Sequence, residues 1–156
     1  MALEIERKYL VDHKKWNELH KPSGKLYRQG YLTTDENKTI RVRLTDSNAH
    51  LTIKGKTKGA TRNEFEFEIP LSEATQLLDS FTESELSKTR YEIHHKEKVW
   101  EVDVFHDAND GLIVAEIELN NEDEHFELPD WVTKEVTDEP KYYNSNLTLL
   151  PFKKWA

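Results

Sequence analysis

The chain has 156 residues and a mass of 18.4 kDa, which is the size of one domain with one sizeable core. Its 22 lysines and arginines against 30 aspartates and glutamates leave a net charge of −8, which disfavours electrostatic binding of nucleic acid. Without cysteine, the chain has no disulfide, thiolate metal site or cysteine nucleophile. No apolar run approaches the roughly 18 residues of a membrane helix, and the charged start MALEIERKYL is unlike a signal peptide. We therefore expect a cytoplasmic protein that binds no membrane.

Apolar and charged residues alternate with a period of two along most of the chain, which predicts β-strands. In residues 64–69, for example, Phe65, Phe67 and Ile69 alternate with three glutamates. The predicted strands, in chain order, are residues 3–11, 25–33, 39–45, 51–56, 64–69, 88–94, 98–105 and 112–120. The turns between them are short, so neighbouring strands are expected to be antiparallel.

Three short helices are also predicted, at residues 13–19, 72–81 and 144–150. We expect Ser72 to be the N-cap of the second helix, because serine side chains accept hydrogen bonds from the free backbone N–H groups of a first turn. Pro151 is expected to end the third helix, since proline cannot continue the backbone hydrogen bonding.

Several predicted strands carry like charges on one face, and the sign changes from strand to strand. Arg41 and Arg43 share a face of their strand, and Glu64, Glu66 and Glu68 share a face of theirs. Neighbouring like charges repel one another, so this pattern indicates ligands of opposite charge. The alternative is an antiparallel sheet, such as a structural β-sandwich, whose charged face is solvated.

If the eight strands close into a barrel, the interior is wide enough for side chains or one small ligand. Burying unpaired charges is costly, so a charged lumen would have to hold water, ions and a ligand, with the apolar faces outside under helices. Carboxylates without cysteine favour Mg²⁺ or Mn²⁺, and arginine pairs suit phosphate oxygens. The combination is typical of metal–polyphosphate sites, which catalyse by positioning and by neutralising charge.

An ExExK motif at the N-terminus, Glu4-Ile5-Glu6-Arg7-Lys8, resembles the signature of the CYTH superfamily, the triphosphate tunnel metalloenzymes. The resemblance continues in order along the chain. Its further segments are Gln29-Gly30-Tyr31-Leu32, Arg41-Val42-Arg43, Thr52-Ile53-Lys54, Glu64-Phe65-Glu66, Lys88-Thr89-Arg90-Tyr91, Glu101-Val102-Asp103-Val104-Phe105, Glu116-Ile117-Glu118 and Val136-Thr137-Asp138 with Tyr142, Tyr143 and Asn144. The resemblance implies one domain over residues 1–156. The implied fold is mainly β (α+β), a closed eight-stranded antiparallel β-barrel tunnel with a few flanking helices.

The resemblance also implies a site. The residues expected to bind the triphosphate are Lys8, Arg41, Arg43, Lys54 and Arg90. The residues expected to hold or orient Mg²⁺ or Mn²⁺, with two ions expected, are Glu4, Glu6, Asp103, Glu116 and Glu118. The residues expected to take part in catalysis are Lys88, Glu4, Glu6 and Tyr31, with Lys88 either a base or a phosphate ligand. Glu64 and Glu66 are expected to support the basic cluster.

The activity that the resemblance implies is hydrolysis of a triphosphate, and we expect inorganic tripolyphosphate, cleaved to diphosphate and phosphate. The charged faces carry no aromatic cluster that would bind a nucleoside or thiamine. Thiamine triphosphatase and class IV adenylyl cyclase activities stay open as alternatives, as does a non-catalytic module that binds polyphosphate or nucleotides. The expected partner is the small-molecule substrate, not nucleic acid, and a homodimer stays open.

Other prominent residues are expected to have structural roles or to lie in solvent. Solvent at a tunnel mouth is expected around Lys56, Glu68, Glu92 and Glu101. Packing outside the barrel or beneath helices is expected for Trp16, Trp100, Trp131 and Trp155.

Overall fold

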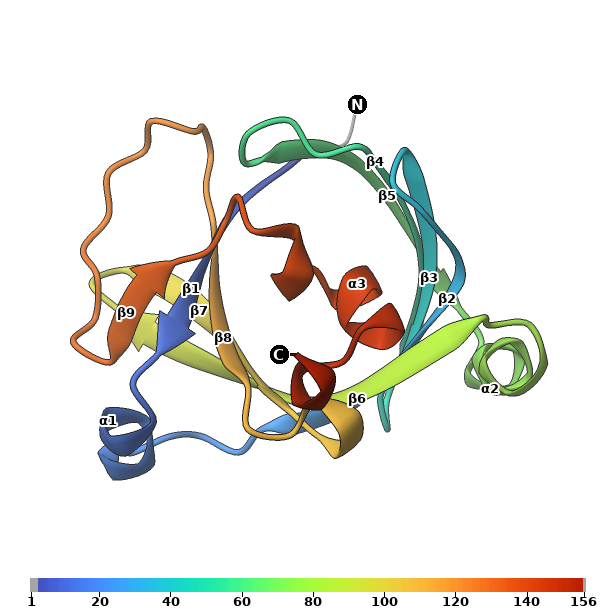
Figure 1. The fold of residues 1–156 in the computed structure, drawn as a ribbon, viewed down its shortest axis with the longest axis horizontal. Coiled ribbons are helices and arrows are strands. Elements are labelled where there is room, and N and C mark those ends of the chain that lie inside the picture. The colour runs from blue at the N-terminus through green and yellow to red at the C-terminus, as the bar shows by residue number, and fades with distance from the viewer. Residues whose placement is uncertain (1–2, 156) are drawn as a thin grey trace.

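In the computed structural model, which describes residues 3–155, eight antiparallel strands close into a barrel, as predicted (Figure 1). The order around the barrel is β5-β4-β3-β2-β6-β7-β8-β1, and β1 pairs with β5 to complete the ring. The strands are β1 (Leu3–Val11), β2 (Lys25–Asp35), β3 (Lys38–Leu44), β4 (Ala49–Gly55), β5 (Thr61–Ile69), β6 (Ser84–His95), β7 (Lys98–Phe105), β8 (Ile113–Glu118) and β9 (Val132–Glu135).

Strand β1 closes the barrel with only the first part of its length. Residues 3–5 pair with β5, whereas Tyr9 and Val11 on the same edge pair with the short strand β9. The other edge of β1 pairs with β8 over residues 6–10. Strand β9 is absent from the predicted set because four residues are too few to show an alternating pattern.

All three predicted helices are present, as α1 (His13–Glu18), α2 (Leu71–Ser80) and α3 (Asn144–Leu149). The predicted N-cap of α2 is wrong. Pro70 occupies that position without a side-chain hydrogen bond, and Ser72 lies inside the first turn. Proline has a fixed φ that suits the extended cap conformation, so α2 begins one residue earlier than expected. Short 3₁₀ helices are found at Asp107–Asn109, Pro140–Tyr142 and Phe152–Lys154.

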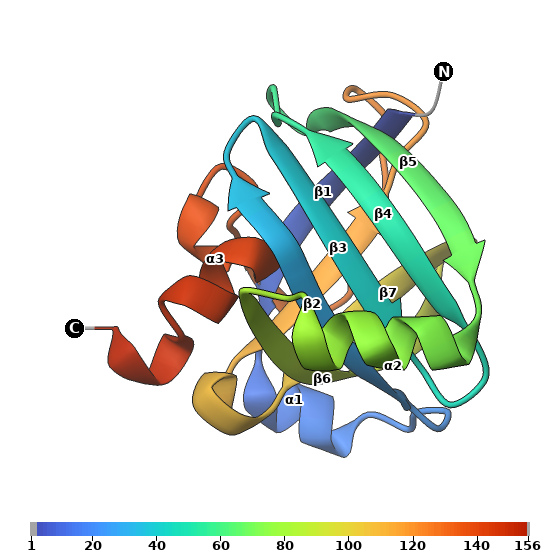
Figure 2. The ribbon, with the colours of Figure 1, turned by 90° about the vertical axis from the view of Figure 1, so that its right-hand side faces the viewer.

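The apolar faces of the strands look outward, as predicted, and most are covered, but Phe65 and Phe67 on β5 are exposed, so the expected cover is missing there. Trp100 and Ile117 pack there against Trp16 of α1 and against Trp131, in a cluster that buries each of these side chains. Figure 2 shows α2 lying across the outer face of the barrel, where its Leu78 packs in a cluster with residues of β3 and β4. Because the apolar faces lie on the outside of the barrel, the charged faces of the strands point into its interior.

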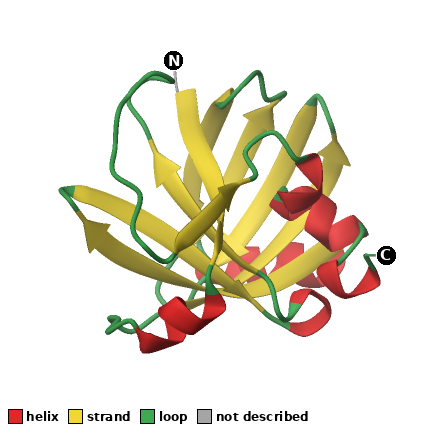
Figure 3. Cartoon of the chain, turned by 60° about the vertical axis from the view of Figure 1, so that its left-hand side comes forward, coloured by secondary structure: helices red, strands yellow, loops and turns green. Residues whose placement is uncertain are grey.

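The C-terminal segment closes one end of the barrel. Figure 3 shows α3 and its neighbouring helical turns gathered at that end. There, Leu147 and Tyr142 pack against Leu86 and Phe105, which lie on the same strand faces as the charged residues farther along. An apolar cluster therefore fills this end of the barrel, and the charged residues on the same strand faces line the rest of the interior. No helix within residues 3–155 is long and apolar enough to cross a membrane.

Candidate functional site

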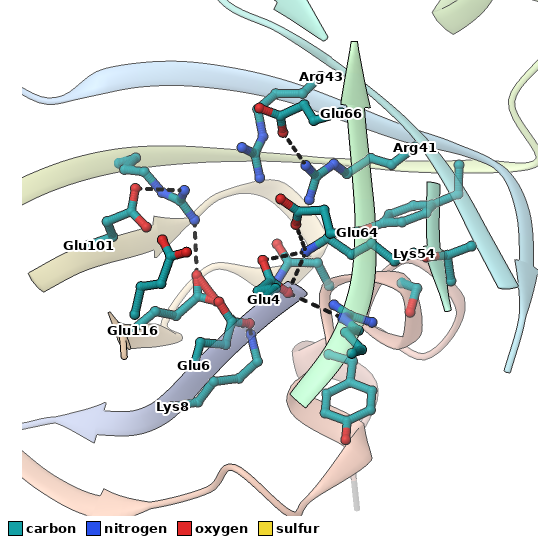
Figure 4. Close-up of a pocket in the computed structure, with 18 of the residues that line it drawn as sticks. Glu4, Glu6, Lys8, Arg41, Arg43, Lys54, Glu64, Glu66, Glu101 and Glu116 are labelled. Carbon is teal, nitrogen blue, oxygen red and sulfur yellow. Dashed lines mark hydrogen bonds and ion pairs between the residues drawn. The ribbon is translucent and has the colours of Figure 1, made fainter. Parts of the chain in front are cut away.

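The inward faces of the strands enclose a cavity of about 190 Å³ whose lining is mostly charged (Figure 4). The basic residues that line it are Lys8, Arg41, Arg43, Lys54, Arg62, Lys88 and Arg90. The acidic residues that line it are Glu4, Glu6, Glu64, Glu66, Glu101, Glu116 and Glu118. The remaining lining residues are Tyr31, Thr39, Tyr143, Asn144 and Ser145. Every site residue predicted from the sequence belongs to this lining except Asp103.

The register of the barrel sets opposite charges against one another across neighbouring strands. The pairs that lie directly opposite are Lys8 with Glu116, Lys54 with Glu64, and Arg90 with Asp103. Such cross-strand neighbours offset the repulsion between like charges that follow each other along one strand. The sequence shows which charges share a strand face, and the register decides which charges meet.

Asp103 lies beneath the cavity surface and holds two bases. Its side chain is 1% exposed, and it accepts two hydrogen bonds from Arg90, at 2.8 and 2.9 Å. The same carboxylate accepts a hydrogen bond from Lys88 Nζ at 2.8 Å. Burial alone would raise the pKa of Asp103, but the Arg90 and Lys88 charges hold it below its usual value. The ionised carboxylate thereby fixes both bases in place.

Lys88 is almost fully buried and faces competing charges. Burial lowers the pKa of Lys88 to about 7, with Asp103 opposing this shift and the positive charges of Arg90 and Arg43 reinforcing it. Besides its bond to Asp103, Nζ donates to Oδ1 of Asn144 at 2.7 Å. Besides its bond to Cε, Nζ has three tetrahedral directions; two of them point to these acceptors, and one is left.

Lys8 and Lys54 are each held by carboxylates of the lining. Lys8 Nζ lies 2.6 Å from Glu116 and 3.1 Å from Glu6. Burial opposes the charge of Lys8, but these two acids raise its pKa above the usual value. Lys54 Nζ lies 3.0 Å from Glu4, but burial and the nearby arginines still lower its pKa. In the ligand-free protein, the charge of each of these two lysines is therefore paired with that of a carboxylate.

Arg41 and Arg43 are less fully matched. Arg41 lies 3.5 Å from Glu66, and its buried Nε has no hydrogen-bond partner among the described residues. Within residues 3–155, Arg43 forms no ion pair, and its Nε donates to the neutral Gln29 Oε1 at 3.1 Å. Desolvation, together with the neighbouring arginines 41 and 90, lowers the pKa of Arg43 to about 10. An adjacent guanidinium pair with spare donors is suited to bind phosphate oxygens.

Two acids of the lining, Glu101 and Glu118, lie close to other carboxylates. Desolvation raises the pKa values of Glu101 and Glu118, and repulsion from neighbouring glutamates adds to the shift. No group of three Asp, Glu or His side chains within residues 3–155 is arranged to hold a metal ion. Lysines already hold Glu4 and Glu116, so a cation would have to replace these partners. The oxygen donors themselves are those that Mg²⁺ and Mn²⁺ prefer.

Some lining residues lie outside the predicted site. Arg62 donates to Glu4 at 3.3 Å, and it could have been found by extending the alternation of the fifth strand two residues earlier. Glu101, which was expected in solvent, lines the cavity and accepts from Arg90 at 3.2 Å. Glu101 is two residues before Asp103 and so lies on the same strand face, and this spacing was the feature of the sequence that could have placed it in the cavity. Tyr143 and Asn144 reach the cavity through the C-terminal segment, and strand periodicity carries no information on that path.

Comparison with known proteins gives a family and full-length relatives. The CYTH domain model matches residues 2–150. An inorganic triphosphatase of Acetivibrio thermocellus is 43% identical over 156 residues, covering 99% of both chains. An inorganic triphosphatase of Nitrosomonas europaea is 33% identical over 150 residues, covering 94% of this chain and 97% of that protein.

Solved structures share the fold. The structure of the inorganic triphosphatase NE1496 matches with a TM-score of 0.65 and 30% identity, covering 94% of this chain and 97% of that one. A putative adenylate cyclase from Bacillus halodurans matches with a TM-score of 0.54 and 18% identity, covering 78% of this chain and 84% of that one. At that identity the second match bears on the fold alone.

Proposed function

The chain belongs to the CYTH domain family, and from this membership we propose that it is a divalent-cation-dependent inorganic triphosphatase. Its reaction is the cleavage of tripolyphosphate to diphosphate and phosphate, with residues 1–156 acting as one triphosphate tunnel domain. The observation that carries this proposal is the cavity in which the incompletely matched Arg41 and Arg43 face a set of carboxylates. Such a cavity offers binding groups for both an anion and a cation.

The basic residues bind the triphosphate in this proposal. Arg41 and Arg43 take phosphate oxygens first, because their donors are least engaged by carboxylates. Lys8, Lys54 and Arg90 surround the same cavity and contribute charge as their ion pairs open. Hydrogen bonds between ionised partners are stronger than neutral ones, so these exchanges favour a highly charged ligand.

The acidic residues hold Mg²⁺ or Mn²⁺ in this proposal, with two ions expected. The residues assigned to this role are Glu4, Glu6, Glu116 and Glu118. A bound divalent cation would neutralise charge on the phosphate oxygens and lower the pKa of water. Asp103 acts as an orienting residue for Arg90 and Lys88, because its oxygens accept from both.

Lys88 and Tyr31 complete the proposed machinery. The remaining direction of Lys88 Nζ suits it to form a hydrogen bond with a phosphate oxygen. Tyr31 is buried, lines the cavity and accepts a hydrogen bond from Gln29 at 2.9 Å, so its phenol O–H is available as a donor. Glu64 and Glu66 support the basic cluster through Lys54 and Arg41.

The lining favours an inorganic substrate. Seven basic residues surround the cavity, whereas Tyr31 and Tyr143 are the aromatic residues in its lining. Binding energy should therefore come from phosphate groups, and a nucleoside or thiazolium would gain few contacts. Thiamine triphosphate and ATP are the competing substrates to be tested.

A phosphate-release screen tests this function. Tripolyphosphate, ATP, thiamine triphosphate and pyrophosphate are compared with Mg²⁺, with Mn²⁺ and with EDTA. We expect the highest kcat/KM for tripolyphosphate and no turnover in EDTA. Preferred hydrolysis of ATP or thiamine triphosphate, formation of cyclic AMP, or binding of triphosphate without turnover would each replace this function with another.

A further inference from the structure

Two neutral carboxamides, Gln29 and Asn144, accept hydrogen bonds from basic residues of the cavity. Gln29 is on β2 and has no exposed surface, whereas Asn144 is the first residue of α3 and lines the cavity. They lie 115 positions apart in the sequence, yet Gln29 Nε2 donates to Asn144 Oδ1 at 3.2 Å. This bond joins the wall of the barrel to the C-terminal segment that closes it.

Gln29 orients Arg43. The Gln29 Oε1 accepts a hydrogen bond from Arg43 Nε at 3.1 Å, and its Nε2 also donates to the Tyr31 hydroxyl at 2.9 Å. Guanidinium groups only donate, so turning the amide over would lose the bond to Arg43. Gln29 therefore holds Arg43 through Nε, and among the described residues both terminal amino groups stay without a hydrogen-bond partner.

Asn144 orients Lys88. Gln29 and Asn144 thus form a hydrogen-bonded relay between Arg43 and Lys88. Its Oδ1 accepts from Lys88 Nζ at 2.7 Å and from Gln29, and both neighbours are donors. The oxygen is therefore fixed, and the amide nitrogen cannot replace it. Lys88 is held between this oxygen and the Asp103 carboxylate, which sets the direction of its remaining Nζ valence.

The helix that carries Asn144 is firmly anchored. Leu147 is fully buried in the apolar cluster that closes the barrel, and its carbonyl accepts from Asn109 Nδ2 at 3.3 Å. Thr148 accepts a hydrogen bond from Ser84 of β6 at 2.7 Å. The position of Asn144 thus depends on packing that involves neither Lys88 nor Arg43.

Neutral partners differ from carboxylates in what they leave for a ligand. Glu116 orients Lys8 but also cancels its charge, whereas a carboxamide orients a cation and leaves the charge in place. We propose that Gln29 and Asn144 are positioning residues that aim Arg43 and Lys88 at the triphosphate and add no negative charge of their own, so that among residues 3–155 Asp103 is the single carboxylate paired with Lys88 and Arg43 has none. This inference rests on the proposed function for the identity of the anion and on the hydrogen bonds for the relay.

Substitutions separate the orientation of the cations from their charge. Gln29→Leu removes the relay at similar volume, and Gln29→Glu keeps an acceptor for Arg43 but adds a negative charge. Asn144→Ala removes the shared acceptor, and Asn146→Ala is the matched control two positions along α3. The Asn146 amide donates to the Pro140 carbonyl at 2.8 Å and does not line the cavity.

Two measurements test this relay, the NMR signal of the Arg43 side chain and the kinetics of tripolyphosphate hydrolysis. In ¹H–¹⁵N spectra of the substrate-free protein, the Arg43 Nε–H signal is identified by its loss in Arg43→Lys. We expect it to weaken or shift in Gln29→Leu and to persist in Gln29→Glu and Asn146→Ala. We also expect Gln29→Leu, Gln29→Glu and Asn144→Ala to lower kcat/KM for tripolyphosphate about tenfold or more, the loss typical of a hydrogen bond to a charged group. The Asn146→Ala variant should match the parent.

A double-substitution cycle shows whether Gln29 acts through Arg43. In the Arg43→Lys background, Gln29→Leu should add less than about a twofold loss, because coupled residues are not additive. Additive losses, or parent values of kcat and KM in both Gln29→Leu and Asn144→Ala, would overturn the inference. If Gln29→Leu does not fold, Gln29→Glu and Asn144→Ala decide the matter. If the parent protein does not hydrolyse tripolyphosphate, the proposed function is refuted. The Arg43 signal would still decide whether Gln29 orients that side chain.

Discussion

Individual basic side chains of the cavity differ in how much of their charge a carboxylate already matches. Lys8 lies against two glutamates, which raise its pKa despite burial. Arg43 has only a neutral hydrogen-bond acceptor among the described residues, and its pKa is lowered to about 10. A group whose charge is disfavoured in the free protein gains most when an anion arrives. Arg43 and the adjacent Arg41 should therefore contribute most to anion binding.

Replacing either arginine tests this ranking. With tripolyphosphate present, the parent should show a higher melting temperature, because a ligand that binds the native state stabilises it by mass action. Arg41→Ala or Arg43→Ala should remove most of this shift and raise KM about tenfold or more. Thermal melts with and without tripolyphosphate provide the measurement. Unchanged shifts in both variants would mean that the anion binds elsewhere.

Glu116 belongs to the acidic set of the cavity and forms ion pairs with two residues of the basic set. Its carboxylate pairs with Lys8 at 2.6 Å and with Arg90 at 3.0 Å, and burial is outweighed by these charges, so its pKa is held well below the usual value. Glu116→Gln keeps the shape but removes the charge, and it should lower turnover about a hundredfold or more.

Steady-state kinetics over a range of Mg²⁺ concentrations check this expectation, with circular dichroism to verify the barrel. Glu92→Gln is the control, because Glu92 is exposed on β6 and does not line the cavity. Near-parent turnover of Glu116→Gln at all Mg²⁺ concentrations would remove Glu116 from the proposed metal ligands.

At the scale of elements, α3 contributes packing as well as a functional side chain. Leu147 is fully buried against the apolar end of the barrel, whereas Leu149 on the same helix is 57% exposed. A six-residue helix is too short to be stable by itself, so tertiary contacts must hold it. The residues that fill the closed end are thus the ones that stabilise α3.

Truncating the two leucines compares these environments directly. Leu147→Ala should reduce the free energy of unfolding by about 2–5 kcal/mol, the usual cost of a cavity in a core. Leu149→Ala should change it by no more than about 0.5 kcal/mol. Urea unfolding monitored by tryptophan fluorescence measures both. Equal effects of the two substitutions would contradict the assignment of Leu147 to the closed end.

For the whole molecule, the charges around the cavity nearly balance. Seven basic and seven acidic residues line it, and Asp103 lies beneath. An anion that takes the bases leaves acids without partners, and a divalent cation that takes the acids leaves bases without partners. Each ligand should therefore favour the binding of the other.

This coupling can be measured by thermal stability. We expect the melting temperature to rise more with Mg²⁺ and a slowly hydrolysed triphosphate analogue together than the sum of the two separate rises. Each ligand should also bind more tightly when the other is present, by the same factor. Calorimetric titrations in both orders provide the second measurement. Strictly additive shifts would show that the two charge sets respond independently.

Sequence patterns account for much of this molecule because a strand has a period of two. Alternation alone placed Arg41 and Arg43 on the face of their strand opposite to Val42 and Glu64 on the face of its strand opposite to Phe65, and the resemblance of the motifs added the expected closure into a barrel. Strand boundaries were less well predicted. The fifth strand begins at Thr61, so Arg62 was missed.

Which side chains share a strand face is determined by the sequence itself, because side-chain direction follows from local backbone geometry. Depth along the tunnel and contacts across it are determined by the tertiary structure, since register and the path of the C-terminal segment depend on distant packing. Leu86 and Lys88 share a face of β6, but only the docking of α3 makes one part of an apolar cluster and the other part of the cavity. The bond between Gln29 and Asn144 has the same origin, because the burial of Leu147 brings together two carboxamides that no local pattern connects.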